Sequence, residues 1–177
     1  MLKMRIKIHD KGVFDQIKNQ TVKLRAGFLG GDMYESIDEP FYGNELKKSD
    51  QDYIGYDFPK RNPKPRRFGK RKAIPVAQVA LFNEYGGGHT PPRPFMDKTF
   101  RWYNKKWRKS IERLVYDTMN LKTTLEDLGP AVVSDIQGVI NDLDTPPNAP
   151  STVKAKGFNN PLIDSGQMLN SVRYEVL

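Results

Sequence analysis

The sequence has no cysteine and only two histidines among its 177 residues. The lack of cysteine excludes disulfide bonds and thiolate metal ligands. His9 lies in a segment of alternating polarity and His89 in a glycine–proline loop, and neither has a second histidine or a carboxylate at metal-site spacing. We therefore expect both histidines at the surface, and the sequence predicts no metal and no cofactor.

Long hydrophobic runs are also missing. No apolar run approaches the roughly 20 residues that a membrane-spanning helix needs. Hydrophobic residues make up 37% of the chain and charged residues 28%, a composition typical of a soluble domain. A chain of this length can bury a core of its own. We expect a single domain over residues 1–177, without a membrane partner.

Catalytic motifs are equally scarce. Gly86-Gly87-Gly88 is not followed by lysine and a hydroxyl residue, and it ends a predicted helix where a phosphate loop would begin one. Asp164-Ser165-Gly166 places a serine beside an acid, but without the frame of a nucleophile elbow, so a turn with a helix cap is the simpler interpretation. We predict that the protein is not an enzyme, has no catalytic residue and takes no small-molecule substrate.

Positive charge is concentrated in one segment. The net charge is +8, and residues 60–72 contain eight basic residues and no acid: Lys60, Arg61, Lys64, Arg66, Arg67, Lys70, Arg71 and Lys72. The rest of the chain is formally neutral, with 21 basic and 21 acidic residues. Such a cluster binds DNA by counterion release or holds an acidic surface of a neighbouring subunit as an electrostatic clasp. We favour the clasp, with DNA contact second and a solvated loop third.

The basic cluster belongs to a longer insertion, residues 32–73, that has no hydrophobic periodicity. Its first half, residues 32–52, is acidic, with seven acidic residues against two lysines. A structureless connection of this length is uncommon in a compact domain and is often functional. Because the insertion is rich in aromatic residues, we interpret it as a charged loop or arm that orders against a neighbouring subunit, with Tyr53 and Tyr56 as interface candidates. A mobile surface loop is the equal alternative.

Helical periodicity appears after this insertion. Residues 76–85 follow a proline suited to a first helical position and end at Gly86, which favours a helix stop. A longer helix over residues 95–120 follows, with one apolar stripe: Met96, Phe100, Tyr103, Trp107, Ile111, Leu114 and Val115. The opposite face carries Trp102, Lys106, Lys109, Arg113 and Tyr116. An exposed tryptophan among cations is a stacked surface residue or an interface anchor, and we favour the interface.

A further amphipathic helix is predicted from a capping box, with Thr123 as the cap and Glu126 three residues later. Its apolar positions are Leu125, Leu128, Val132, Ile136, Val139, Ile140 and Leu143. Pro130 either kinks this helix or marks its true first turn. Gly138 is expected to allow a close approach of a second helix.

Strand patterns lie at both ends of the chain. Alternation in residues 2–8 and 22–29 predicts two half-buried strands, and Val172, Tyr174 and Val176 predict a closing strand. We expect a short helix around residues 13–17, a surface strap over 151–161 and a short helix capped by Asp164 or Ser165. The predicted fold is α+β: a small antiparallel sheet of N- and C-terminal strands packed on two long helices and one short helix.

Two ordered blocks resemble a bacteriophage family. The first is Val76-Ala77-x-x-Ala80-x-x-Asn83-Glu84-Tyr85-Gly86 followed by Pro91-x-Arg93-Pro94-Phe95. It is similar to the signature of the tail-component or tail-completion proteins in the head–tail neck of long-tailed phages. The second runs from Ala149-Pro150-Ser151-Thr152-Val153 through Pro161-Leu162-Ile163-Asp164-Ser165-Gly166 to Val172 and resembles the closing segment of that family. Ser165 stands where threonine is commoner, and the insertion before Ile74 is a further departure.

This resemblance implies a structural virion protein, assembled in the cytoplasm of the bacterial host. It would form a homo-oligomeric ring of six copies in the neck, between the head connector or adaptor and the tail tube, around a lumen for DNA. A tail-terminator ring of the same neck region is an alternative. The residues by themselves leave open a different class of protein, a basic nucleic-acid-binding module that uses residues 60–72.

Overall fold

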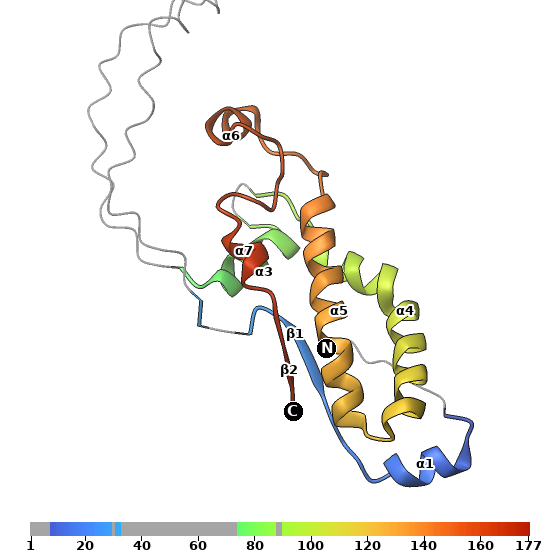
Figure 1. Cartoon of the computed structure of the whole chain (residues 1–177). Coiled ribbons are helices and arrows are strands. Elements are labelled where there is room, and N and C mark those ends of the chain that lie inside the picture. Colours follow the sequence, from blue (N-terminus) through green and yellow to red (C-terminus); the bar gives the residue numbers. More distant parts are fainter. Residues whose placement is uncertain (1–7, 30, 33–73, 88–89) are drawn as a thin grey trace, which may run out of the picture. The chain divides into compact units, whose positions relative to one another are not determined.

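The computed structural model describes residues 8–29, 31–32, 74–87 and 90–177. Apart from Ile74, these residues belong to one compact unit. Along the chain its elements are α1 (Lys11–Ile17), β1 (Leu24–Gly27), α3 (Val76–Tyr85), α4 (Phe95–Thr118), α5 (Leu121–Asp142), α6 (Pro150–Lys156), α7 (Gln167–Asn170) and β2 (Arg173–Val176) (Figure 1). The fold is α+β, as predicted. The expected strand over 2–8 lies outside the described residues except for its last residue, and the charged arm over 32–73 lies outside them except for its first residue, Asp32.

The sheet joins segments from the two ends of the chain. Strands β1 and β2 are antiparallel, with Leu24 opposite Val176 and Gly27 opposite Arg173. Reciprocal backbone hydrogen bonds between Lys23 and Leu177, of 2.8 and 2.9 Å, extend the ladder by one pair. A two-stranded sheet is only marginally stable in water, so its order depends on what it packs against. Both strands pack on α5.

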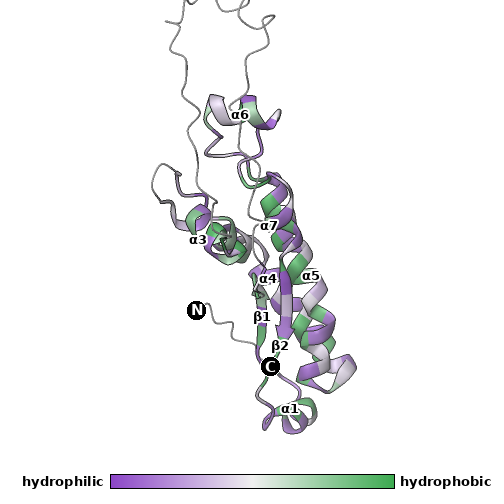
Figure 2. Cartoon of the chain, turned by 90° about the vertical axis from the view of Figure 1, so that its left-hand side faces the viewer, coloured by the Kyte–Doolittle hydropathy of each residue, from purple (hydrophilic) through white to green (hydrophobic). Residues whose placement is uncertain are grey.

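Helices α4 and α5 form a hairpin that supplies most of the core. Each presents a row of buried residues at a spacing of four or a multiple of four: Phe95, Thr99, Trp107, Ile111 and Val115 on α4, and Thr124, Leu128, Val132, Ile136 and Ile140 on α5. Rows of this spacing are the ridges that fit into the grooves of a facing helix. In Figure 2, α5 carries apolar and polar residues side by side along its length, as expected of an amphipathic helix.

The buried face of α4 differs in part from the prediction. Trp107, Ile111 and Val115 are buried as expected, whereas Phe100 and Leu114 are only half-buried. Met96 and Tyr103 are also half-buried, and the fully buried positions of the first two turns are Phe95 and Thr99. The buried row follows a spacing of four, which turns slowly around the helix, because α4 crosses its neighbours at an angle. On α5 the predicted apolar positions are buried, except Leu125, which is half-buried.

The start of α5 corrects the predicted capping box. Met119 takes a left-handed conformation with φ 52°, and Asn120 is the N-cap. The Asn120 Oδ1 atom accepts hydrogen bonds from the N–H groups of Lys122 and Thr123, at 2.9 and 3.2 Å. Thr123 therefore lies inside the first turn and is not the cap. An asparagine side chain three residues earlier already satisfies the free N–H groups that the capping box would have served.

Two further predictions for α5 concern Pro130 and Gly138. Pro130 lies inside the helix, so the alternative that it marks the first turn is wrong. A Cβ atom built on Gly138 would meet nothing within 4 Å, so no close approach requires glycine there. The close approach occurs instead at Gly129, where a Cβ would lie 2.2 Å from the Tyr174 ring. It brings α5 against a strand and not against a second helix.

The remaining short elements agree partly with the sequence. The expected short helix is α1, which Asp10 caps; its Val13 and Ile17 are buried and its Phe14 is exposed. The expected strap over 151–161 contains helix α6, which begins with Pro150 at a position where its missing N–H costs nothing. Helix α7 is present, but its N-cap is Gly166 and has no side-chain cap. The segment 150–156 is helical because Pro150 suits the first position of a helix and Gly157 takes the left-handed conformation that ends one.

Candidate assembly surfaces

The first block of the phage resemblance forms a closed corner between α3 and α4. Gly86 ends α3 with φ 79°, and a Cβ there would lie 3.1 Å from Thr90 O and Pro92 N. Gly87 and Thr90 exchange backbone hydrogen bonds of 3.0 and 2.9 Å, and Arg93 N–H donates to Asn83 O at 2.6 Å. The glycine is needed both for its φ and for the close backbone approach.

Glu84 caps α4 from the neighbouring helix. The two carboxylate oxygens accept the N–H groups of Met96 and Asp97, at 2.9 and 3.1 Å. The N-cap position of α4 is Pro94, whose side chain cannot accept a hydrogen bond. A carboxylate also interacts favourably with the positive end of the helix dipole. Glu84 is only 8% exposed, so this acid of the signature block is a structural group of the interior.

Arg93 ties the same corner to the loop after α5. Its Nε donates to Pro146 O at 2.9 Å, and a terminal nitrogen donates to Pro147 O at 3.2 Å. The second terminal nitrogen lies 3.5 Å from Asn83 Oδ1. Burial lowers the pKa of Arg93, but an arginine stays protonated in proteins. Asn83, Glu84 and Arg93 therefore hold three segments together and are not presented to a partner.

The opposite side of α3 is apolar and exposed. Leu81, Phe82 and Tyr85 are 54%, 46% and 74% exposed, at positions that share one side of the helix. We call these three residues the α3 outer face. The buried positions of α3 are Val76, Ala80 and Glu84, which lie on the other side of the helix. Helix α3 has apolar residues on both its buried and its exposed side, so its sequence shows no single apolar stripe.

The outer side of α4 carries the interface residues predicted from the sequence. Trp102 and Tyr116 are 62% and 41% exposed, and Lys109 and Arg113 lie between them on the exposed side. Lys105 is also exposed there. We call Trp102, Lys105, Lys109, Arg113 and Tyr116 the α4 outer face. Their exposure agrees with the sequence analysis, and their role at an interface stays a prediction.

Lys106 is an exception among the predicted interface residues. Its ammonium forms an ion pair with Asp135 of α5 at 2.8 Å, although the lysine side chain is 56% exposed. Asp135 also accepts the indole N–H of the buried Trp107 at 2.8 Å. Lys106 is therefore committed to a contact within the chain, which the helical spacing alone did not indicate.

Helix α4 is the basic part of the described fold. It has seven basic and three acidic residues, whereas the other described residues include nine basic and eleven acidic ones. Arg101 pairs with Asp97 at 2.7 Å and Lys106 with Asp135. Within the described part of the chain, Lys105, Arg108, Lys109 and Arg113 have no ion-pair partner. The α4 outer face is thus a cationic surface with an aromatic residue at each end.

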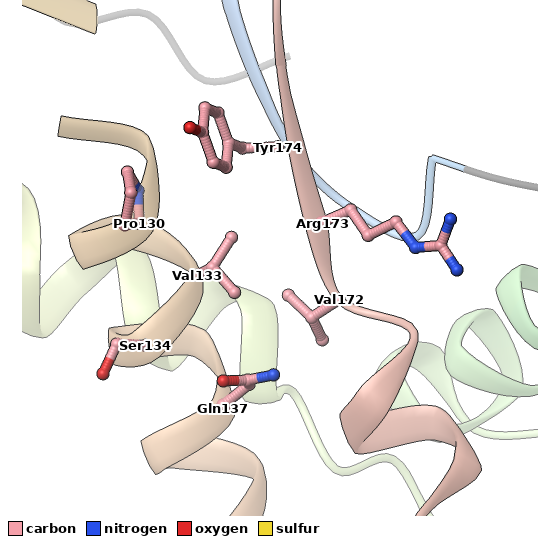
Figure 3. Close-up of a pocket in the computed structure, with 7 residues that line it drawn as sticks. All are labelled: Pro130, Val133, Ser134, Gln137, Val172, Arg173 and Tyr174. Atoms are coloured by element: carbon pink, nitrogen blue, oxygen red, sulfur yellow. The ribbon is translucent and has the colours of Figure 1, made fainter. Parts of the chain in front are cut away.

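A shallow groove of about 400 Å³ lies between α5 and the start of β2 (Figure 3). Its lining residues are Pro130, Val133, Ser134, Gln137, Val172, Arg173 and Tyr174. None of these is a carboxylate or a histidine. Gln137 donates to Leu169 O at 3.1 Å, and Arg173 turns away from α5 to pair with Asp32 at 3.1 Å. The groove thus lacks an acid–base pair.

A metal site and a membrane-spanning helix are the other features that bear on function. Among residues 8–29, 31–32, 74–87 and 90–177, no group of three or more His, Asp or Glu could hold a metal ion. No helix in these same ranges is long and apolar enough to cross a membrane. His9 is exposed as expected, and His89 lies outside the described residues. So do Tyr53, Tyr56 and the eight basic residues of 60–72.

No family model, curated protein or solved structure matches this chain. The resemblance to phage neck proteins therefore depends on the two quoted blocks alone. In the first block, the structure divides the residues into an interior set that forms the corner and an exterior set that forms the α3 outer face.

Proposed function

We propose that this protein is a structural component of the neck of a long-tailed bacteriophage. Copies of the chain form a ring that completes the tail and joins it to the head connector, with the DNA passing through the lumen. A tail-terminator ring at the same neck is the alternative position. The proposal is supported by the two sequence blocks and by exposed surfaces that suit assembly.

The observation that carries the proposal is the two-sided character of α3. On its buried side, α3 packs within the chain through Val76, Ala80 and Glu84 and forms the corner with α4. The α3 outer face leaves three large apolar side chains exposed within a five-residue stretch. Apolar side chains gathered on one exposed helix side are typical of a protein–protein contact.

The arrangement of the two outer faces suits a ring. The α3 and α4 outer faces differ in chemistry, one being apolar and the other cationic and aromatic. A face that meets a different surface of the next copy makes a heterologous contact, which generates a ring when the rotation between copies closes. A self-complementary dimer would instead need one face that matches itself.

The experiment is to determine the assembly state of the purified full-length chain by light scattering, native mass spectrometry and negative-stain imaging. We expect closed rings. The double variant Leu81→Arg/Tyr85→Arg should lose them, because two charges would be buried at the contact. The control is Phe14→Arg, which places one arginine on α1 at a phenylalanine that is 50% exposed; the single variants Leu81→Arg and Tyr85→Arg match it in charge.

Two results would contradict the proposal. One is a wild-type chain that stays monomeric at all concentrations and does not associate with phage connector or tail-tube rings. The other is deletion of its gene from a producing phage without any accumulation of unjoined heads and tails. Rings that survive Leu81→Arg/Tyr85→Arg would leave the function intact but exclude the α3 outer face as the contact.

A second candidate function is a basic nucleic-acid-binding module. The α4 cations that have no ion-pair partner among the described residues favour it, together with the basic segment 60–72 of the sequence. DNA binding by the monomer that falls steeply with salt, because phosphate contacts release counterions, would support this module. Neutralising Arg66, Arg67, Lys70 and Arg71 should then abolish it. Ring formation without DNA affinity would support the structural function.

A further inference from the structure

We propose that the α4 outer face binds the acidic segment of a second copy of this chain, residues 34–53. The inference rests on the self-association that the proposed function requires, and it names the two surfaces that meet.

The α4 outer face is a continuous strip on one side of a helix. Its members follow one another at spacings of three and four residues, from Trp102 to Tyr116. At 1.5 Å per residue the strip is about 21 Å long. The length suits a peptide of several residues, not a single side chain.

The chemistry of this strip selects an acidic partner. Lys105, Lys109 and Arg113 have no ion-pair partner among the described residues, although Arg101 and Lys106 on the same helix do. A contact with a neutral partner would bury these three charges unpaired, which is costly. Carboxylates supply the missing partners.

The aromatic residues at the two ends of the strip restrict further which partner fits it. Trp102 and Tyr116 expose flat apolar rings beside the cations. Such rings gain from stacking on other aromatic residues, and cations gain from lying over aromatic faces. The strip therefore favours an acidic peptide that also contains aromatic residues. Duplex DNA would pair with the cations, but its phosphate backbone offers the two rings no face to stack on.

Residues 34–53 have this composition. They include six acidic residues against two lysines, and four aromatic residues, Tyr34, Phe41, Tyr42 and Tyr53. The densest acidic group, Glu35, Asp38 and Glu39, lies close to the first of the aromatics. Twenty residues span at most about 70 Å when fully extended, so only part of the segment is needed to cover the strip.

The position of the segment's ends indicates a second copy as the source. Asp32 O accepts the N–H of Val76 at 2.9 Å, so both ends of the intervening chain are held together. Asp32 also pairs with Arg173 of β2, which places this junction beside the sheet. The sheet and α4 pack on different sides of α5 over most of its length (Figure 1). Near the junction the described end of the sheet meets α4 at its first residues, Phe95 and Met96. Asp32 and Val76 therefore lie on the sheet side of α5, whereas the α4 outer face lies on the other side, and a neighbouring copy in a ring can present that face directly.

A charge-exchange experiment tests this contact in the full-length chain. Variant A carries Lys105→Glu, Lys109→Glu and Arg113→Glu, and variant B carries Glu35→Lys, Asp38→Lys and Glu39→Lys. Each variant alone should assemble at least about ten-fold more weakly than the wild type, because like charges then meet. An equal mixture of A and B should recover the assembly, since each altered surface again finds its opposite. Light scattering and mass photometry measure both effects.

The control for total charge is Lys11→Glu/Lys23→Glu/Lys154→Glu. These three lysines are exposed on other elements, and the change in net charge equals that of variant A. The control should assemble like the wild type. Circular dichroism and thermal unfolding establish that variant A is folded, which is expected because its altered side chains are exposed.

A second measurement does not depend on ring formation. A synthetic peptide of residues 33–53, titrated into the chain, should change the emission of Trp102, weaken with salt and lose its effect in variant A. Trp102→Phe should remove the signal, because the other tryptophan, Trp107, is only 7% exposed. A scrambled peptide of the same composition separates the contribution of sequence from that of charge.

The outcomes separate the inference from the proposed function. Wild-type-like assembly of variant A would overturn the inference while leaving the ring in place. Loss of DNA binding by variant A, with assembly and peptide binding unaffected, would assign the face to DNA and also overturn it. If the wild type never assembles, the ring function fails, and the peptide titration alone decides whether the α4 outer face recognises this segment.

Discussion

The ring of Tyr174 lies directly against the backbone of Gly129. A Cβ atom at Gly129 would lie 2.2 Å from two atoms of the Tyr174 ring, closer than any real Cβ contact. This contact packs β2 against α5. It requires glycine at position 129, although glycine is unfavourable within a helix on propensity alone.

Gly129→Ala should therefore destabilise the fold, by about 1–3 kcal/mol as expected for overpacking, even though alanine is the better helix former. Urea unfolding measures the change. The matched control is Gly138→Ala in the same helix, where a Cβ meets nothing within 4 Å. The control should stabilise the protein, by up to about 1 kcal/mol. Equal effects of the two substitutions would contradict the role of Tyr174.

The cap that Glu84 provides for α4 gives a second prediction. Glu84→Ala removes both acceptors of the Met96 and Asp97 N–H groups, and we expect a loss of about 1–3 kcal/mol in the free energy of unfolding. Hydrogen exchange at the first turn of α4 should accelerate more than exchange in α5. The control is Glu126→Ala, whose exposed pairing with Lys122 at 3.8 Å should contribute less than about 0.5 kcal/mol.

A third prediction concerns the tie made by Arg93. Arg93→Lys keeps the positive charge. The guanidinium donates to Pro146 O and Pro147 O from two nitrogens in a fixed plane, and a lysine ammonium cannot reproduce that geometry. We expect a loss of about 1–3 kcal/mol, together with faster hydrogen exchange in residues 144–149. Unchanged exchange in this loop would show that Arg93 is not what holds it.

The shared acceptor Asp135 gives a fourth prediction. Asp135→Ala leaves the buried Trp107 N–H without a partner, and should cost about 1–3 kcal/mol. Lys106→Met removes only a half-exposed ion pair, so it should cost less than about 1 kcal/mol. Emission of Trp107, isolated in a Trp102→Phe background, should change in the first variant and not in the second. The opposite order would mean that the ion pair, and not the indole, holds Asp135 in place.

Local signals in the sequence predicted most of the elements. The proline start and glycine stop of α3 and the apolar row of α5 depend on residues close in the chain. So does the alternation that predicts β1, and periodicity reports such local preferences directly. Where a local signal misled, a competing local group was the reason. Asn120, three residues before Thr123, satisfied the N–H groups that the capping box would have served.

The candidate surfaces were only partly predictable. The exposure of Trp102 and Tyr116 followed from helical spacing, and so did their position on the face opposite the core. The pairing of Lys106 with Asp135 did not, since it joins residues 29 positions apart on two helices. The α3 outer face was missed for a related reason. Helix α3 has apolar residues on more than one side, and this pattern does not itself show which side the rest of the chain covers.

The sequence by itself determined the α+β class, the positions of the long helices and the concentration of charge, because these follow from composition and short-range patterns. The tertiary structure alone decided that Glu84 and Arg93 are interior ties, and that Gly129 and not Gly138 is the close approach. It also decided which cations of α4 form an ion pair within the described part of the chain, as Arg101 and Lys106 do. Each of these depends on which distant segments meet, and the geometry of packing sets that after the local elements have formed.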